Sequence, residues 1–440
     1  MDSGLQIGFL LSYFVAVYAL GLWSRKGETT GEFLIANRSV GTLLTTASVS
    51  AVIGGVFLGN VSFLAFEFGM GAMWLVGGFA FGLFLLGAVA SRIKAVADEH
   101  RFLTLPDYLF TKFDARTGYL GAGVLFLGFL LILAGQFVIA GLLFSTLFPI
   151  EYPLAVFGMG GATLAYVVLG GFKAVVRTDL LQFAIMAVVF GLFLPFNVDV
   201  RVLGTLAELG SPGALTIASL FLGGTASLFM GADVWQRLYS ARTPAVARNS
   251  LFLASAIWVV FGLSLTLLGI AARGSAASAD QALLAGLFEA FPEQLAGLAA
   301  VALLAALMST IDTEMFLLAS SVAKDFVAKR KALTDREMAR IIRGAMIGIS
   351  VPAMAIAIGF PRVYDLLAYF NSLMLALFPA VLSSLFWTLK KQAVFASVVV
   401  GLFSLVPLFL LGQFNPDTAP LAVLAGSTVA LIAGQRIAAG

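Results

Sequence analysis

The chain has 440 residues, of which 60% are hydrophobic and only 11% are charged. About a quarter of the residues in soluble domains are charged, so this composition excludes an ordinary soluble protein and indicates a membrane protein. Cysteine is absent and the single histidine is His100, which excludes disulfides and leaves no residues for a His/Cys metal site. The formal charge of +3 gives no indication of nucleic-acid binding.

About thirteen apolar stretches are long enough to cross a bilayer as helices of roughly 20 residues. Membrane barrels have short alternating segments instead, so the predicted fold class is an all-α membrane protein. The first stretch lacks a basic leader and a cleavage site, and we expect it to be a retained helix. The predicted spans are 4–23, 42–69, 72–91, 118–147, 153–169, 178–197, 214–233, 249–273, 292–323, 340–359, 364–388, 393–412 and 419–436.

The basic residues predict the orientation of these spans. If the N-terminus is outside, all of the 26 lysines and arginines except Arg201, Arg273 and Arg362 lie at or near the cytoplasmic face. Because cytoplasmic loops of membrane proteins are enriched in Lys and Arg, we expect the N-terminus outside and the C-terminus inside.

The second and seventh spans each contain a pair of glycines in the middle. The second span contains Gly54, Gly55 and Gly59, and the seventh contains Gly223, Gly224 and Gly231. The two spans are five apart and therefore run in opposite directions, as expected for an inverted repeat whose broken helices bind ions and substrate. Close helix packing is the alternative for either pair alone.

Two polar residues stand out in the spans between these two. Gln136 is an isolated amide in the apolar stretch 118–147, where pairing with a neighbouring helix is as plausible as contact with a substrate. Asp179 opens the span 178–197, and its alternatives are a helix cap or a partner for Lys173 or Arg177.

The ninth span carries the sequence AALMSTIDTEMFLLASS at residues 305–321. At 100° per residue, Ser309, Thr310 and Thr313 share about one third of the helix surface, which indicates either packing or an oxygen-rich site. Asp312 and Glu314 lie about 160° apart on this helix, so they cannot serve the same site. A carboxylate inside a membrane is costly unless it is paired or hydrated, and hard oxygen ligands suit an alkali ion.

The chain resembles the sodium/solute symporter family, which includes proline, pantothenate, sialic acid and sugar transporters. The resemblance covers nearly the whole chain. It rests on EFLIANRSVG (32–41), LTLPDYL (103–109), GGFKAVVRTDLLQ (170–182), QRLYSARTPAVAR (236–248) and AALMSTIDTEMFLLASSVAKD (305–325).

The resemblance implies a LeuT-like fold in one transmembrane domain, 1–440. In that fold 4–23 is an additional helix, 42–197 and 214–388 are the two inverted repeats, and 393–436 is peripheral. It also implies one sodium ion bound by residues from the second and ninth spans, namely Ser50, Ile53, Ala306, Ser309 and Thr310. A possible second cation site consists of Asp179, Asp312 and Thr313. Candidate substrate contacts are Gly54, Gly55, Asn60, Gln136 and Phe229.

We therefore expect a secondary transporter that couples sodium to the import of a small organic solute across a bacterial inner membrane. Asp233 stands where sugar-transporting relatives have a tyrosine, which favours an amino acid or a carboxylate over a sugar. The alternative is a transporter-like sensor module of a signalling protein. The sequence has no nucleophile–base pair or phosphate loop, so we expect neither an enzyme nor an organic cofactor.

Overall fold

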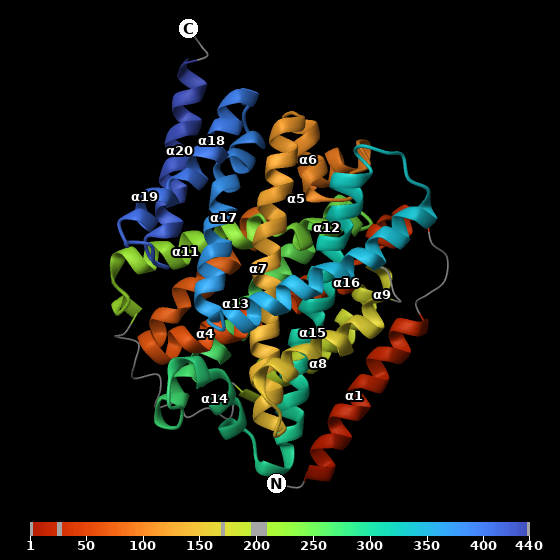
Figure 1. The fold of residues 1–440 in the computed structure, drawn as a ribbon, viewed down its shortest axis with the longest axis vertical. Helices are drawn as coiled ribbons and strands as arrows, with labels where there is room; N and C mark the ends of the chain where they lie inside the picture. Colours follow the sequence, from red (N-terminus) through yellow and green to blue (C-terminus); the bar gives the residue numbers. More distant parts are fainter. Residues whose placement is uncertain (1–2, 24–28, 169–171, 195–208, 438–440) are drawn as a thin grey trace.

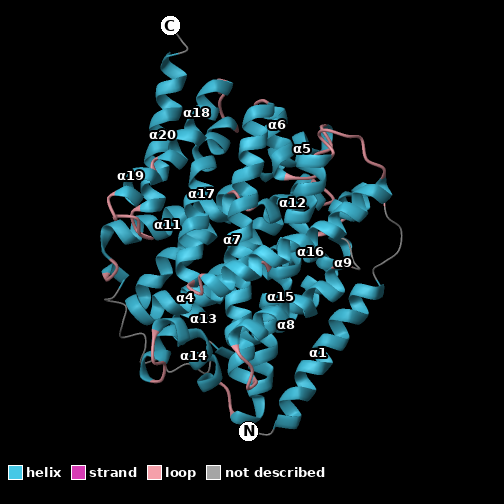
Figure 2. Cartoon of the chain, in the orientation of Figure 1, coloured by secondary structure: helices cyan, strands magenta, loops and turns pink. Residues whose placement is uncertain are grey.

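The computed structural model describes residues 3–23, 29–168, 172–194 and 209–437. Over these residues the fold is helical and contains no strand, apart from one isolated bridge between Val40 and Ala241 (Figures 1 and 2). This confirms the predicted all-α class. Within the described residues each predicted span overlaps helix, and the ends of 153–169 and 178–197 lie outside those residues. Nine helices in the described part are long and apolar enough to cross a bilayer. The exact count of thirteen spans stays a prediction.

The first half of the chain contributes one outer helix and a set of packed helices. They are α1 (Ser3–Trp23), α2 (Thr30–Ile35), α3 (Thr42–Ala51), α4 (Gly55–Phe68), α5 (Met73–Glu99), α6 (Leu105–Lys112), α7 (Ala115–Leu147), α8 (Tyr152–Val167) and α9 (Phe172–Met186), which a π-helical turn η3 (Ala187–Phe193) extends. Capping residues in the sequence determine where several of these helices begin. Asp114 caps α7 by accepting a bond from the Thr117 N–H (2.8 Å), and Thr104 and Asp107 form a capping box on α6.

The second half contributes the remaining helices. Its helices are α11 (Gly213–Phe229), α12 (Ala232–Ser240), α13 (Pro244–Ala271), α14 (Ala282–Ala290), α15 (Ala296–Ser321) with the π-helical turn η8 (Val322–Val327), α16 (Asp335–Gly359), α17 (Val363–Ser384), α18 (Lys391–Phe403), α19 (Leu405–Leu410) and α20 (Ala419–Ile437). Figure 1 shows α18–α20 together at one side. It also shows that α1 begins at the opposite end of the long axis from the end of α20.

Both glycine-containing spans are interrupted, as the sequence predicts. The second span breaks between α3 and α4, where Gly54 has an extended backbone (φ −88°, ψ −178°). The seventh breaks between α11 and α12 at Gly231, not at Gly223–Gly224, which lie inside α11. A methyl group on Gly224 would lie 3.1 Å from the Leu75 carbonyl of α5, so this glycine serves close packing rather than a break.

The helix α15 occupies the centre of the molecule and packs against α1, α7, α9 and α16 (Figure 1). Of the residues in its most apolar window, 94% are buried inside the protein. This burial explains why its sequence is apolar all round, with small and hydroxyl side chains where other backbones approach.

Candidate functional site

The break between α3 and α4 lies against the hydroxyl residues of α15. The Ser309 hydroxyl donates to the Ala51 carbonyl at 2.7 Å, which joins the end of α3 to α15, and it also lies 2.9 Å from the carbonyl of Ala306. The Thr310 hydroxyl lies 3.2 Å from the same Ala306 carbonyl. A methyl group on Gly54 would lie 2.3 Å from the Thr310 hydroxyl oxygen, so this close approach requires glycine.

These contacts bring together most of the oxygens predicted to bind sodium, with a difference of one residue in α3. The carbonyl that meets Ser309 belongs to Ala51, whereas the Ser50 carbonyl accepts from the Ile53 N–H at 3.2 Å. The Val52 carbonyl accepts from the Gly54 N–H at 2.7 Å. Carbonyl and hydroxyl oxygens are the ligands that a hard alkali ion takes, so the donor set fits sodium.

Gln136 of α7 connects the break to α15. Its side-chain oxygen accepts from the Val56 N–H in the first turn of α4 at 3.1 Å, and its amide bonds the Glu314 carboxylate. A methyl group on Gly54 would lie 2.8 Å from the Gln136 nitrogen. The sequence left open whether Gln136 pairs with a neighbouring helix or faces a substrate, and in the structure it lies where it can do both.

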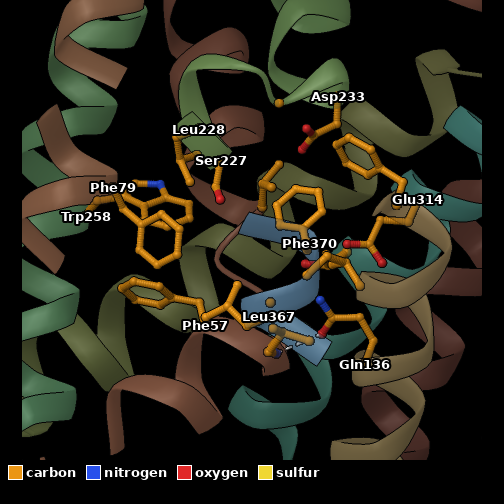
Figure 3. A pocket seen from close by; sticks show the side chains of 17 residues that line it. Phe57, Phe79, Gln136, Ser227, Leu228, Asp233, Trp258, Glu314, Leu367 and Phe370 are labelled. Atoms are coloured by element: carbon orange, nitrogen blue, oxygen red, sulfur yellow. Dashed lines mark hydrogen bonds between the residues drawn. The ribbon is translucent and has the colours of Figure 1, made fainter. Parts of the chain in front are cut away.

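A cavity lies between the two broken helices, and its roughly 500 Å³ of space includes the part that is open to solvent. Figure 3 shows Phe57, Phe79 and Trp258 on one side and Asp233, Glu314 and Gln136 on the other. Its lining residues are Val52, Gly54, Val56, Phe57, Phe79, Phe129, Ile132, Gln136, Ser227, Leu228, Gly231, Asp233, Trp258, Thr310, Glu314, Leu367 and Phe370.

The cavity contains only some of the predicted substrate contacts. Gly54 and Gln136 line it, whereas Gly55 packs against α15, where a methyl group would lie 2.3 Å from Leu307. Asn60 is outside the lining and donates to the Val56 carbonyl at 2.7 Å. Phe229 is also outside it and packs on Phe378 with 5.3 Å between ring centroids.

A second polar cluster lies on another side of α15, centred on Arg237 of α12. The Arg237 guanidinium donates to the Asp179 carboxylate at 2.9 Å and to the Thr313 hydroxyl at 2.8 Å. It also donates to Ser48 at 2.6 Å, and the Ser48 hydroxyl in turn bonds Asp179. Arg237 and Asp179 are both almost fully buried. The predicted second cation site thus contains a protein cation that the sequence reasoning did not consider.

The two carboxylates of α15 point in different directions, as their angular separation predicts. Glu314 lines the central cavity, whereas Asp312 is buried outside its lining. Tyr13 of α1 lies within electrostatic reach of both Asp312 and Asp179. The sequence reasoning gave Glu314 no site, and only the structure shows which face of α15 meets the cavity.

Ion pairs connect the loops at the end of the molecule where α6 lies. Asp107 of α6 binds Lys324 at 3.0 Å and Lys329 at 3.5 Å. Although burial opposes it, these charges and the Leu103 N–H hold the pKa of Asp107 below its usual value. Arg38 donates to the carbonyls of Phe102 (2.9 Å) and Tyr239 (3.2 Å), which ties the segment before α3 to the ends of α5 and α12.

Comparison with known proteins is consistent with this geometry. Residues 33–290 match the model of the sodium:solute symporter family. The osmoregulated proline transporter OpuE of Bacillus subtilis is 26% identical, covering 96% of this chain and 92% of that protein. The sodium/proline symporter of Escherichia coli is also 26% identical, over 91% of this chain and 85% of that protein.

Solved structures show the same fold. A Na⁺-coupled sialic acid symporter in a substrate-bound outward-open state superposes with a TM-score of 0.84 at 15% identity, covering 98% of this chain and 97% of that one. Mhp1, a nucleobase-cation-symport-1 family transporter in a closed conformation, gives a TM-score of 0.57 at 14% identity, covering 92% and 94%. At these identities the likeness concerns the fold alone.

Proposed function

Because the chain belongs to the sodium:solute symporter family, we propose that sodium binds where the α3–α4 break meets α15. The protein is a multi-pass membrane transporter that couples sodium to the import of a small solute, and it is not an enzyme. The observation that supports the location is the Ser309 hydroxyl on the Ala51 carbonyl, since it puts backbone and side-chain oxygens from both helices in one place.

The proposed ligands are three carbonyls and two hydroxyls. From α15 they are the Ala306 carbonyl and the hydroxyls of Ser309 and Thr310. From the break we take the carbonyls of Ile53 and Ala51, with Ala51 in place of the predicted Ser50, because the Ala51 carbonyl is the one that meets the Ser309 hydroxyl. Sodium at this junction stabilises the contact between the break and α15, next to the cavity for the solute.

A single sodium ion is the simplest stoichiometry for this arrangement. The guanidinium of Arg237 already donates to Asp179 and Thr313, two of the three residues predicted to hold a second cation with Asp312. Two positive charges on one buried carboxylate repel each other. A second cation at Asp179 and Asp312 would have to share the Asp179 carboxylate with Arg237.

The test removes one hydroxyl at a time. Ser309→Ala and Thr310→Ala should each raise the sodium concentration for half-maximal thermal stabilisation about tenfold, equivalent to about 1.4 kcal/mol of binding. The measurement is the unfolding temperature of the purified full chain as NaCl replaces KCl. Ser320→Ala, a buried serine further along the same helix, is the matched control and should behave as the parent. A parent protein that responds equally to NaCl and KCl would contradict the proposal.

We also propose the predicted orientation, with α1 beginning outside and α20 ending in the cytoplasm. Because the chain has no cysteine, Ser278→Cys and Ala332→Cys provide single labels at two exposed loop positions. A membrane-impermeant maleimide applied to intact cells should label the variant at 278, and the variant at 332 only after permeabilisation. The reverse pattern would show that the orientation is inverted.

A further inference from the structure

The cavity is lined by two carboxyl groups and by no basic side chain of the described residues. Asp233 and Glu314 both line it, and none of the residues lining it is a lysine or an arginine. Asp233 and Glu314 are 3% and 2% exposed, so water compensates neither charge. The nearby Arg237 directs its guanidinium to Asp179, and it reaches the backbone carbonyl of Asp233 at 3.3 Å.

Hydrogen bonds within the protein occupy only some of the oxygens of these two carboxyl groups. The Asp233 carboxylate accepts backbone N–H groups in the first turn of α12, where a helix dipole favours an anion. Gln136 donates to Glu314, but one carboxylate oxygen of Glu314 has no hydrogen-bond partner among the described residues. A buried carboxylate oxygen at a cavity wall is suited to a positively charged hydrogen-bond donor.

The opposite wall of the cavity is aromatic. The rings of Phe57, Phe79 and Trp258 form a mutually packed triangle with centroid separations of 4.7, 5.3 and 5.6 Å. The Trp258 indole N–H has no partner in the described part of the chain, although the side chain is only 2% exposed. These rings provide an apolar surface, and their faces attract cations.

From these two walls, and resting on the function proposed above, we propose that the solute is an organic amine without a carboxylate. Its ammonium group binds between Asp233 and Glu314, and its apolar body packs against Phe57, Phe79 and Trp258 (Figure 3). A solute with its own carboxylate would bring a third carboxyl group into a cavity that has no lysine or arginine among its described lining residues.

A proton or a sodium ion on these carboxylates would lead to a different choice of solute. A proton on Glu314 would leave the cavity less charged, so that an amine and a neutral alcohol of the same shape would bind equally well. A sodium ion on the carboxylates could receive the carboxylate of a zwitterionic solute, which would favour an amino acid over the amine.

The experiment compares ligands that share a phenylethyl body and differ in charge. Phenethylamine is the cation, L-phenylalanine the zwitterion, 3-phenylpropionate the anion and 2-phenylethanol the neutral form, with L-proline added because the relatives' names include it. Binding to the purified full chain is measured by thermal shift and by tryptophan fluorescence, each in NaCl and in KCl. We expect phenethylamine to bind at least tenfold more tightly than each of the others, and more tightly in NaCl.

Variants then test which side chains recognise the positive charge of the ligand. Glu314→Gln and Asp233→Asn should each weaken phenethylamine binding about tenfold and leave 2-phenylethanol binding unchanged, so that the preference for the cation is lost. Glu99→Gln changes an exposed glutamate at the end of α5 and should leave the preference intact. A variant that misfolds would lose the response to 2-phenylethanol as well, which separates a folding defect from a loss of recognition.

The outcomes separate this inference from the proposed function. Tighter binding of L-phenylalanine or L-proline, or equal binding of the amine and the alcohol, would overturn the amine assignment and leave sodium coupling standing if NaCl still stabilises the protein. No difference between NaCl and KCl with any ligand would overturn the sodium proposal itself. Amine preference retained in both carboxylate variants would show that the aromatic wall alone selects the solute, which contradicts the assignment of the ammonium to Asp233 and Glu314.

Discussion

Both broken helices are interrupted at a glycine, but the side chains around the two breaks differ in their chemistry. At the α3–α4 break, the side chains that approach are the neutral groups of Ser309, Thr310 and Gln136. At the α11–α12 break, charged groups follow at once, since α12 carries Asp233 toward the cavity and Arg237 toward Asp179. A broken helix frees backbone groups at the break, whereas the side chains that surround each break decide whether it is suited to a bare ion or to a charged organic group.

The largest expected effect tests the charged side of this comparison. Arg237→Met leaves Asp179 buried without its guanidinium, and breaking a buried ion pair in this way costs about 3–5 kcal/mol. We expect a large fall in the unfolding temperature of the purified protein. Arg92→Met, at an exposed position of α5, should have little effect.

The double variant Asp179→Asn/Arg237→Met sharpens this test, because it removes both charges and should recover much of the lost stability. If the single Arg237 variant is as stable as the parent, the stability of the α12 region does not depend on the ion pair. The distinction between a neutral α3–α4 break and a charged α11–α12 break would then be wrong.

A smaller effect is expected from the equivalent glycine in each break. A methyl group on Gly54 would lie 2.3 Å from the Thr310 hydroxyl oxygen, whereas on Gly231 its nearest atom is the Asp233 carboxylate at 3.0 Å. Gly231 has φ −57°, which alanine also adopts. We therefore expect Gly54→Ala to raise the sodium concentration for half-maximal thermal stabilisation about tenfold, and Gly231→Ala to leave it nearly unchanged. Equal effects would show that the two breaks are not chemically distinct.

Much of the fold could be predicted from the sequence because apolar length is a direct physical requirement for crossing a bilayer. The glycine pairs identified the right two spans. In the seventh span the chain breaks at Gly231, the third of its glycines. The pair at 223–224 lies inside α11, where Gly224 allows the close approach of α5, and the sequence alone does not separate these two roles.

The site could be predicted only in part. The spacing of hydroxyl residues on α15 indicated Ser309 and Thr310. Whether the Ser50 or the Ala51 carbonyl meets Ser309 depends on the geometry of the break, which helical periodicity does not describe. Arg237 was missed because an arginine near the end of a span is usually one that reaches the interface. Phe57, Phe79 and Trp258 were missed because aromatic residues of a core and of a cavity wall have the same sequence pattern.

The central position of α15 has a consequence for biosynthesis. A lone aspartate at the middle of an inserting helix costs about 2.5–3.5 kcal/mol, and this helix carries Asp312 close to Glu314. Three of the helices that surround it, α1, α7 and α9, are made before it, and α16 follows directly. The ribosome therefore delivers this helix when most of the pocket that receives it has already been synthesised. Its carboxylates and hydroxyls can therefore form hydrogen bonds as it enters the membrane, and they need not stay unpaired in lipid until a later part of the chain is made.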